Sequence, residues 1–145
     1  MDAIAGLNHW LDALALRLEP AQRKILMRIL AQGLRLRFKD RIKQQNDPDG
    51  HRFVPRKRDQ IGNIKRQGAL FQNIGNQLKT EYSADHAVVG FGGRTATVAL
   101  VHQDGKTIRP TSTAKPTRYT IRKLVGFSKE DEQWVISEIQ KFLLT

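Results

Sequence analysis

Hydrophobic positions in the first third of the chain recur every three or four residues, the repeat of an α-helix with one apolar face. They predict a helix over residues 1–19 and a long amphipathic helix over residues 20–45, with Pro20 in its first turn. The stripe of the second helix consists of Leu26, Leu30, Leu34, Phe38 and Ile42. Gly33 disfavours the helix locally, so we expect a bend or a close crossing there.

The last part of the chain shows the same helical repeat. Its apolar positions are Trp134, Val135, Ile139, Phe142 and Leu143. Ser128 is a favourable N-cap residue, and Asp131 in the first turn suits the helix dipole. These features predict a packing helix over residues 128–145.

Residues 63–127 favour short strands and turns. Runs over Leu78–Tyr82 and His86–Phe91 predict a β-hairpin, and Tyr119–Leu124 predicts a last strand. A short helix is expected over residues 67–76, whereas residues 94–102 fit either a helix or a strand. The fold class is therefore α+β: two N-terminal helices, a small, mainly antiparallel sheet and a C-terminal helix.

Two segments lack a regular pattern. Residues 46–62 begin with turn formers and predict an extended basic arm, with Phe53 and Val54 as its apolar anchors. Residues 106–118 are rich in threonine and contain two prolines, which indicates an exposed, flexible loop. With 145 residues and 16.5 kDa, the chain is expected to form a single domain, 1–145.

The net charge of +11 is concentrated in two segments. Residues 35–66 carry +7 and residues 106–127 carry +6, whereas residues 128–145 carry −2. Basic surface of this kind faces an acidic partner. The candidate assembly or DNA-facing residues are Arg35, Lys39, Arg41, Lys43, Arg52, Arg56, Lys57, Arg58, Lys65, Arg66, Lys115, Arg118, Arg122 and Lys123.

The closing helix offers a complementary acidic surface. Glu130, Glu132 and Glu138 are its candidate residues, with Asp131 beside them. In a head-to-tail ring, one patch of each subunit must meet a different patch of the next. An acidic and a basic patch on one chain would satisfy that requirement.

Motifs for catalysis, metals or cofactors are weak. The four histidines are not spaced as metal ligands, and Asp47 and Asp49 flank Pro48 as in a turn. We expect no metal, no cofactor and no enzymatic activity; a hydrolase would depend on His102 with no nucleophile beside it. The chain has no cysteine, which excludes disulfides and zinc sites built on cysteine. We expect no membrane span and no secretory signal, and therefore no membrane partner.

Five motifs in order along residues 25–143 carry a family resemblance. After the basic helix come Pro48-Asp-Gly50-x-x-Phe53-x-Pro55, Gly90-Phe-Gly-Gly-Arg94, Val101-His-Gln-Asp-Gly105 and Tyr119-x-x-Arg122-x-Leu-Val-Gly126-Phe-Ser128-x-x-Asp131. This order resembles the phage virion morphogenesis or tail completion proteins of contractile-tailed phages. The motif residues singled out are Pro48, Gly50, Phe53, Pro55, His102, Gln103, Gly105 and Gly126.

The resemblance implies a structural virion protein of the tail or neck, assembled in the host cytoplasm. Its subunits would form a homo-oligomeric ring, commonly of six, that ends tail assembly and mediates head–tail joining. Its implied partners are the tail tube or terminator and the neck or head-completion proteins, with DNA touched non-specifically in the lumen.

The alternative is a DNA-binding module that contacts phosphates through residues 35–66. This block is basic, but Phe38 and Phe53 are its only aromatic residues. Few bases could therefore stack on it.

Overall fold

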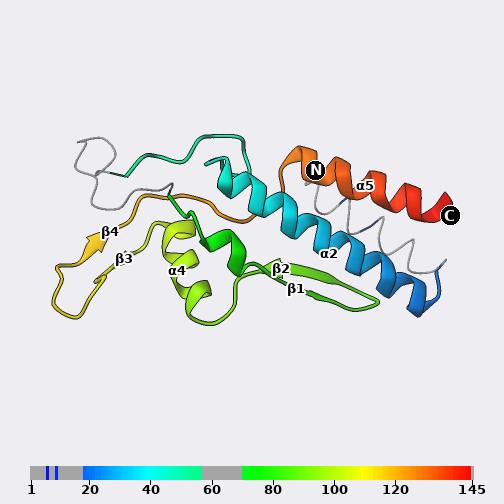
Figure 1. The fold of residues 1–145 in the computed structure, drawn as a ribbon, viewed down its shortest axis with the longest axis horizontal. Helices are drawn as coiled ribbons and strands as arrows, with labels where there is room; N and C mark the ends of the chain where they lie inside the picture. Colours follow the sequence, from blue (N-terminus) through cyan, green and yellow to red (C-terminus); the bar gives the residue numbers. More distant parts are fainter. Residues whose placement is uncertain (1–5, 7–8, 10–17, 57–69, 145) are drawn as a thin grey trace. The chain divides into compact units, whose positions relative to one another are not determined.

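The computed structural model describes residues 6, 9, 18–56 and 70–144 (Figure 1). Its long helices are α2 (Pro20–Lys43) and α5 (Lys129–Leu144), with the shorter α4 (Gly93–Asp104) between them. The remaining elements are the 3-10 helix η1 (Ile74–Gln77) and the strands β1 (Lys79–Tyr82), β2 (Ala87–Gly90), β3 (Thr107–Ile108) and β4 (Thr117–Arg118). The α+β prediction is confirmed, whereas the helix predicted over residues 1–19 lies almost wholly outside the described residues.

The chain divides into two compact units. Unit 1 comprises Met1–Arg37, Lys79–Val89 and Phe127–Thr145, and unit 2 comprises Phe38–Leu78 and Gly90–Gly126. The helix α2 runs without a break from one unit into the other. That the chain forms a single domain stays a prediction.

The core of unit 1 joins α2 to α5. The side chains of Leu26, Leu30, Leu34, Val135 and Ile139 are buried, as the apolar stripes of the two helices predict. A Cβ atom on Gly33 would overlap the ring of Trp134, so the glycine marks the close crossing expected from the sequence. The burial of apolar area between the two helices is the main stabilising term of this unit.

A capping box begins α5. The Ser128 hydroxyl accepts a hydrogen bond from the backbone N–H of Asp131, whose carboxylate accepts one from the N–H of Ser128, both at 3.0 Å. The same carboxylate accepts a 2.8 Å bond from Nε of Arg37 on α2. The predicted cap is confirmed, and Asp131 also ties the two helices together.

The predicted hairpin is present as β1 and β2, which pair in one sheet of unit 1. Its turn is closed by a 2.9 Å hydrogen bond from the N–H of Ser83 to the carbonyl of His86. An ion pair of 3.6 Å joins Arg23 of α2 to Asp85 in this turn. The turn residues therefore also hold the hairpin to the long helix.

In unit 2, residues 94–102 are helical. Gly105 ends α4 in the left-handed conformation with φ 67°, and a Cβ there would come within 2.6 Å of Ile121. Glycine suits both conditions because it lacks a side chain. The chain then enters β3, which pairs antiparallel with β4, Thr107 opposite Arg118 and Ile108 opposite Thr117. Residues 106–118 thus contain a short ladder in place of a wholly irregular loop.

The predicted strand over Tyr119–Leu124 is wrong. This segment is extended, but within the described residues it pairs with no strand. Its hydrogen bonds go elsewhere: the N–H of Arg122 binds the carbonyl of His102 at 2.8 Å, and the N–H of Leu124 binds the side chain of Gln103 at 2.7 Å. A helix end and a side chain take the place of a neighbouring strand, so the predicted small sheet is two separate two-stranded ladders.

The end of α2 is a Schellman motif with an unusual residue. The N–H of Asn46 binds the carbonyl of Arg41 at 3.1 Å, and that of Gln45 binds Ile42 at 2.9 Å. Gln45 has φ 65°, where glycine is usual, and its side-chain amide donates to the carbonyl of Leu70 at 2.7 Å. The side-chain bond compensates for the left-handed backbone and fixes the start of the arm.

The predictions for residues 67–76 and for the arm are only partly confirmed. The short helix expected over residues 67–76 is limited, in its described part, to η1. Of the two expected anchors of the arm, Phe53 is buried, but the Val54 side chain is 45% exposed. No described helix is long and apolar enough to cross a lipid bilayer.

Candidate functional site

The charge of the chain is divided unequally between the two units. Unit 2 contains 16 Lys and Arg residues against 5 Asp and Glu, a net charge of +11. Unit 1 contains 9 of each kind and is neutral. The whole basic excess therefore belongs to unit 2, and this unit is the candidate functional site.

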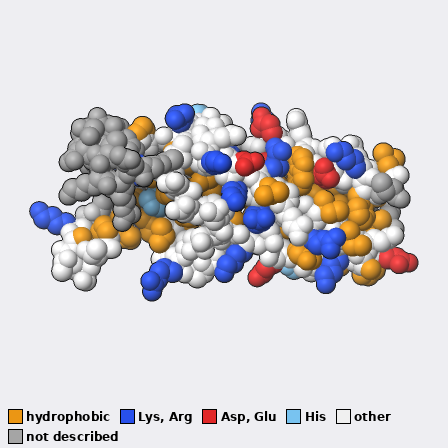
Figure 2. Space-filling view, in the orientation of Figure 1, with side chains coloured by type: hydrophobic (Ala, Val, Ile, Leu, Met, Phe, Trp, Pro, Cys, Tyr) orange, Lys and Arg blue, Asp and Glu red, His pale blue; other side chains and the backbone are white. Residues whose placement is uncertain are grey.

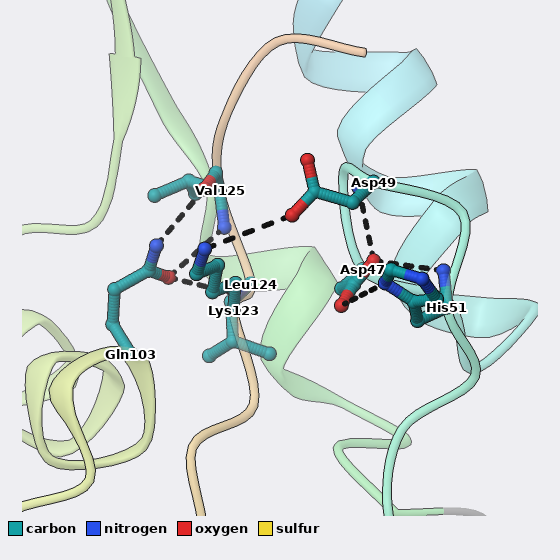
Figure 3. Close-up of polar contacts among 7 residues, drawn as sticks. All are labelled: Asp47, Asp49, His51, Gln103, Lys123, Leu124 and Val125. Atoms are coloured by element: carbon teal, nitrogen blue, oxygen red, sulfur yellow. Dashed lines mark hydrogen bonds and ion pairs between the residues drawn. The ribbon is translucent and has the colours of Figure 1, made fainter.

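The side chain of Gln103, at the end of α4, binds the backbone of Leu124 and Val125 in unit 2 (Figure 3). Its side-chain oxygen accepts hydrogen bonds from the N–H groups of Leu124, at 2.7 Å, and Val125, at 3.3 Å. Its side-chain nitrogen donates to the carbonyl of Val125 at 3.1 Å. One amide side chain thus satisfies backbone groups that a strand partner would satisfy in a sheet.

Two arginines bind the backbone in the same way. Arg122, whose residue exposure is 8%, donates from Nε to the carbonyl of Val54 at 2.8 Å and from its guanidinium to Pro55 at 3.3 Å. Arg41 donates to the carbonyl of Gly126 at 2.9 Å. These bonds join the arm, the end of α2 and the segment after β4 into one structure.

A row of rings lies beside these bonds. Phe53, Phe71, His102 and Tyr119 form three successive edge-to-face contacts with centroid distances of 5.6, 4.7 and 5.2 Å. Burial, and to a smaller extent the charge of Arg122, lowers the pKa of His102. A neutral imidazole between two aromatic rings acts as a packing group, so the geometry gives no support to a hydrolase built on His102.

Asp47, Asp49 and His51 lie close enough together to present three ligand atoms within 4.8 Å of one another. The carboxylate of Asp47 already accepts the N–H groups of Asp49 and His51, each at 2.9 Å, and Asp49 forms a 3.6 Å ion pair with Lys123 (Figure 3). These bonds are those of an Asx turn. The turn interpretation of this segment is therefore confirmed.

The predicted basic residues differ in what their side chains do. Lys43, Arg52, Lys115, Arg118 and Lys123 are exposed, while Arg35, Lys39, Arg41 and Arg56 are half-buried. Arg122 departs from the expected set because it is buried and bonded to the backbone. Lys57, Arg58, Lys65 and Arg66 lie outside the described residues.

The acidic candidates lie on α5 in unit 1. Glu130 is exposed, Glu132 is half-buried, and Glu138 forms a 3.4 Å ion pair with Lys141. Asp131 faces inward and is engaged by Arg37 and by the helix cap. The accessible acidic surface at the start of α5 therefore centres on Glu130 and Glu132.

An open pocket of about 540 Å³ lies beside the end of α2 within unit 2. Lys39 and Lys43 line it together with Gln45, Phe71 and the residues around η1. Phe71 has φ 59°, a conformation rare for an aromatic residue. Two cations of the +7 segment therefore border a pocket of their own unit.

The candidate list left out Lys106 and Arg109 of the +6 segment, which the structure exposes on and beside the β3–β4 hairpin. Their signal was available, because no acidic residue occurs between Asp104 and Glu130. Figure 2 shows basic side chains, in blue, at the left end of the view, where Figure 1 places β3 and β4.

Comparisons with known proteins cover nearly all of the chain. The sequence profile of the phage virion morphogenesis family matches residues 2–144. The chain is similar to tail completion protein S of Escherichia phage P2, with 31% identity over 123 residues, which cover 81% of this chain and 82% of that protein. No solved structure matches.

Proposed function

Because the chain belongs to the phage virion morphogenesis family, we propose that it is a structural protein of the virion, not an enzyme, that completes the tail. The observation that carries the proposal is the similarity to tail completion protein S of phage P2 over four-fifths of both chains. In this role the protein forms a homo-oligomeric ring, six subunits being the number we expect, at the head-proximal end of the tail. There it ends tail assembly and joins the tail to the head through neck or head-completion proteins.

The charge asymmetry of the two units supports a head-to-tail ring. A cyclic ring places unlike surfaces of neighbouring subunits in contact. One chain supplies both an acidic surface, at Glu130 and Glu132, and a unit of net charge +11. We propose that the start of α5 on one subunit meets unit 2 of the next.

The first experiment asks whether the protein acts on tails. Tails assembled with and without the protein are compared by negative-stain imaging, and the purified protein is measured by light scattering after size exclusion. We expect rings, and tails that are competent to join heads only when the protein is present. A protein that stays monomeric at high concentration and leaves tails unchanged would contradict the proposal.

The interface is tested by reversing charge. Glu130→Lys with Glu132→Lys should abolish ring formation at low salt, because like charges would face each other. The matched control is Glu19→Lys with Glu81→Lys, which makes the same change at two exposed acidic residues of unit 1. Rings that form normally with the α5 variant would exclude this surface.

A further inference from the structure

The β3–β4 hairpin carries an uninterrupted set of basic side chains. Lys106, Arg109, Lys115 and Arg118 are all exposed. Within the described part of the chain, none of the four is within ion-pair distance of a carboxylate. Four cations on thirteen residues that contain no acidic side chain produce a positive potential that an external anion can lower.

Other cations of the chain are already engaged. Arg37 is paired with Asp131, and Arg41 and Arg122 donate to backbone carbonyls. In the block of residues 35–66 this engages Arg37 and Arg41, whereas Lys43 and Arg52 of the same block are exposed. The hairpin keeps its cations available.

Hydrogen bonds and a ring contact order the β3–β4 hairpin. The N–H of Tyr119 binds the carbonyl of Lys106 at 3.0 Å, and the ring of Tyr119 contacts His102 on α4. In the loop, Ala114 N–H binds the carbonyl of Thr111 at 3.2 Å. An ordered, anchored hairpin loses less conformational entropy on binding than a free loop.

The composition of the hairpin identifies the anion. Its remaining polar side chains are the hydroxyls of Thr107, Thr111, Ser112, Thr113 and Thr117. Lys, Arg, Ser and Thr are among the side chains that contact DNA phosphates, and Lys and Ser, unlike Arg, are depleted in protein interfaces. Residues 106–118 contain no aromatic side chain on which unpaired bases could stack, which disfavours a single strand.

We propose that the hairpin over residues 106–118 binds the phosphate backbone of duplex DNA without reading its sequence. A two-stranded ribbon also has the size that the grooves of a duplex admit. The inference goes beyond tail completion and concerns the single chain, so it does not depend on ring formation.

The test measures binding of the full-length protein to a short labelled DNA duplex by fluorescence anisotropy over a range of salt concentrations. The hairpin variant combines Lys106→Gln, Arg109→Gln, Lys115→Gln and Arg118→Gln. We expect its affinity to fall on the order of 10- to 1000-fold at low salt, and the slope of log affinity against log salt to fall by up to about 3.6, that is about 0.9 for each phosphate that the variant no longer neutralises. Replacing only Arg109 and Lys115 should give about half the change in slope.

The matched control removes the same charge from unit 1 through Lys24→Gln, Arg28→Gln, Lys79→Gln and Lys129→Gln, all exposed positions. Its salt slope should equal that of the unchanged protein. Equal losses in both variants, or no binding by the unchanged protein at low salt, would overturn the proposal. Vesicles of anionic phospholipid serve as a further probe, and binding to them as tight as to DNA would also overturn the assignment to DNA.

Discussion

The two units of the molecule use charged residues in opposite ways. Unit 1 is neutral, and its described ion pairs join Arg23 to Asp85, Arg37 to Asp131 and Lys141 to Glu138. Unit 2 has three times as many basic as acidic residues, and Arg41 and Arg122 bind carbonyl oxygens there. Charge in unit 1 therefore balances within the unit, whereas unit 2 keeps an excess of positive charge.

The units also differ in what holds them together. The packing of α2 against α5 in unit 1 requires apolar residues of suitable size. Many sequences satisfy this condition. Unit 2 contains irregular segments whose backbone groups need particular side chains, such as Gln103 and Arg122. The eight residues singled out for the family resemblance, from Pro48 to Gly126, lie in unit 2, while the last motif continues to Ser128 and Asp131 in unit 1. Most of the recognisable motif residues therefore lie in the part of the fold in which single side chains replace regular secondary structure.

The largest effect is expected in unit 1 for Asp131→Ala. The change removes the carboxylate that accepts the Ser128 N–H in the capping box and the charge-assisted bond to Arg37, so the free energy of unfolding should fall by about 3 kcal/mol. Chemical denaturation measures it, with Glu130→Ala as the exposed control. A loss no larger than that of the control would show that packing alone holds the two helices together.

A slightly smaller effect is expected in unit 2 for Arg122→Met. Methionine fills much of the same space but leaves the carbonyls of Val54 and Pro55 without their donor, at a cost of about 2 kcal/mol. Arg118→Met, at an exposed position, should change stability by less than about 0.5 kcal/mol. Equal losses of unfolding free energy for Arg122→Met and Arg118→Met would show that the hydrogen bonds of Arg122 add nothing to stability.

Gln103 tests the role of the amide. Gln103→Ala should lower the free energy of unfolding by about 1.5 kcal/mol, because the N–H groups of Leu124 and Val125 lose their acceptor. Gln103→Glu keeps that acceptor but loses the donor to the Val125 carbonyl, and should destabilise less. The urea midpoints of the two variants check the prediction. A lower midpoint for Gln103→Glu than for Gln103→Ala would exclude this account of the Gln103 hydrogen bonds.

The smallest effect is a dependence on pH. The lowered pKa of His102 means that the unfolded chain binds a proton more readily than the folded one, so stability is full above the ordinary value of 6.5 and falls as pH drops below it. His102→Gln should reduce this slope relative to the unchanged protein. Urea denaturation between neutral pH and about pH 5 measures the difference.

The long helices α2 and α5 were predictable because their signals are local. The stripe on α2, the capping residue Ser128 and the crossing at Gly33 follow from repeat and residue type alone, and the structure confirms each. The family resemblance was also predictable, because its motifs combine turn residues with polar side chains at fixed spacing, and the family match confirms it.

The rest depends on partners that are distant in the sequence. In the sequence, Arg122 cannot be distinguished from a surface cation. In the structure it donates hydrogen bonds to the carbonyls of Val54 and Pro55, which lie more than sixty residues away in the chain. Tyr119–Leu124 has the alternation of a strand, but its backbone meets a glutamine side chain and a helix end. A local pattern cannot distinguish these environments.

The order in which the chain is made gives the continuous helix α2 a further consequence. Unit 2 ends at Gly126, so every residue it contains is synthesised before α5. During that interval Gly33 and Arg37 on α2 lack their α5 partners Trp134 and Asp131. A nascent chain that stalls before α5 would have the apolar stripe of α2 without the apolar face of α5, and association through the stripe is the hazard that the last helix lowers.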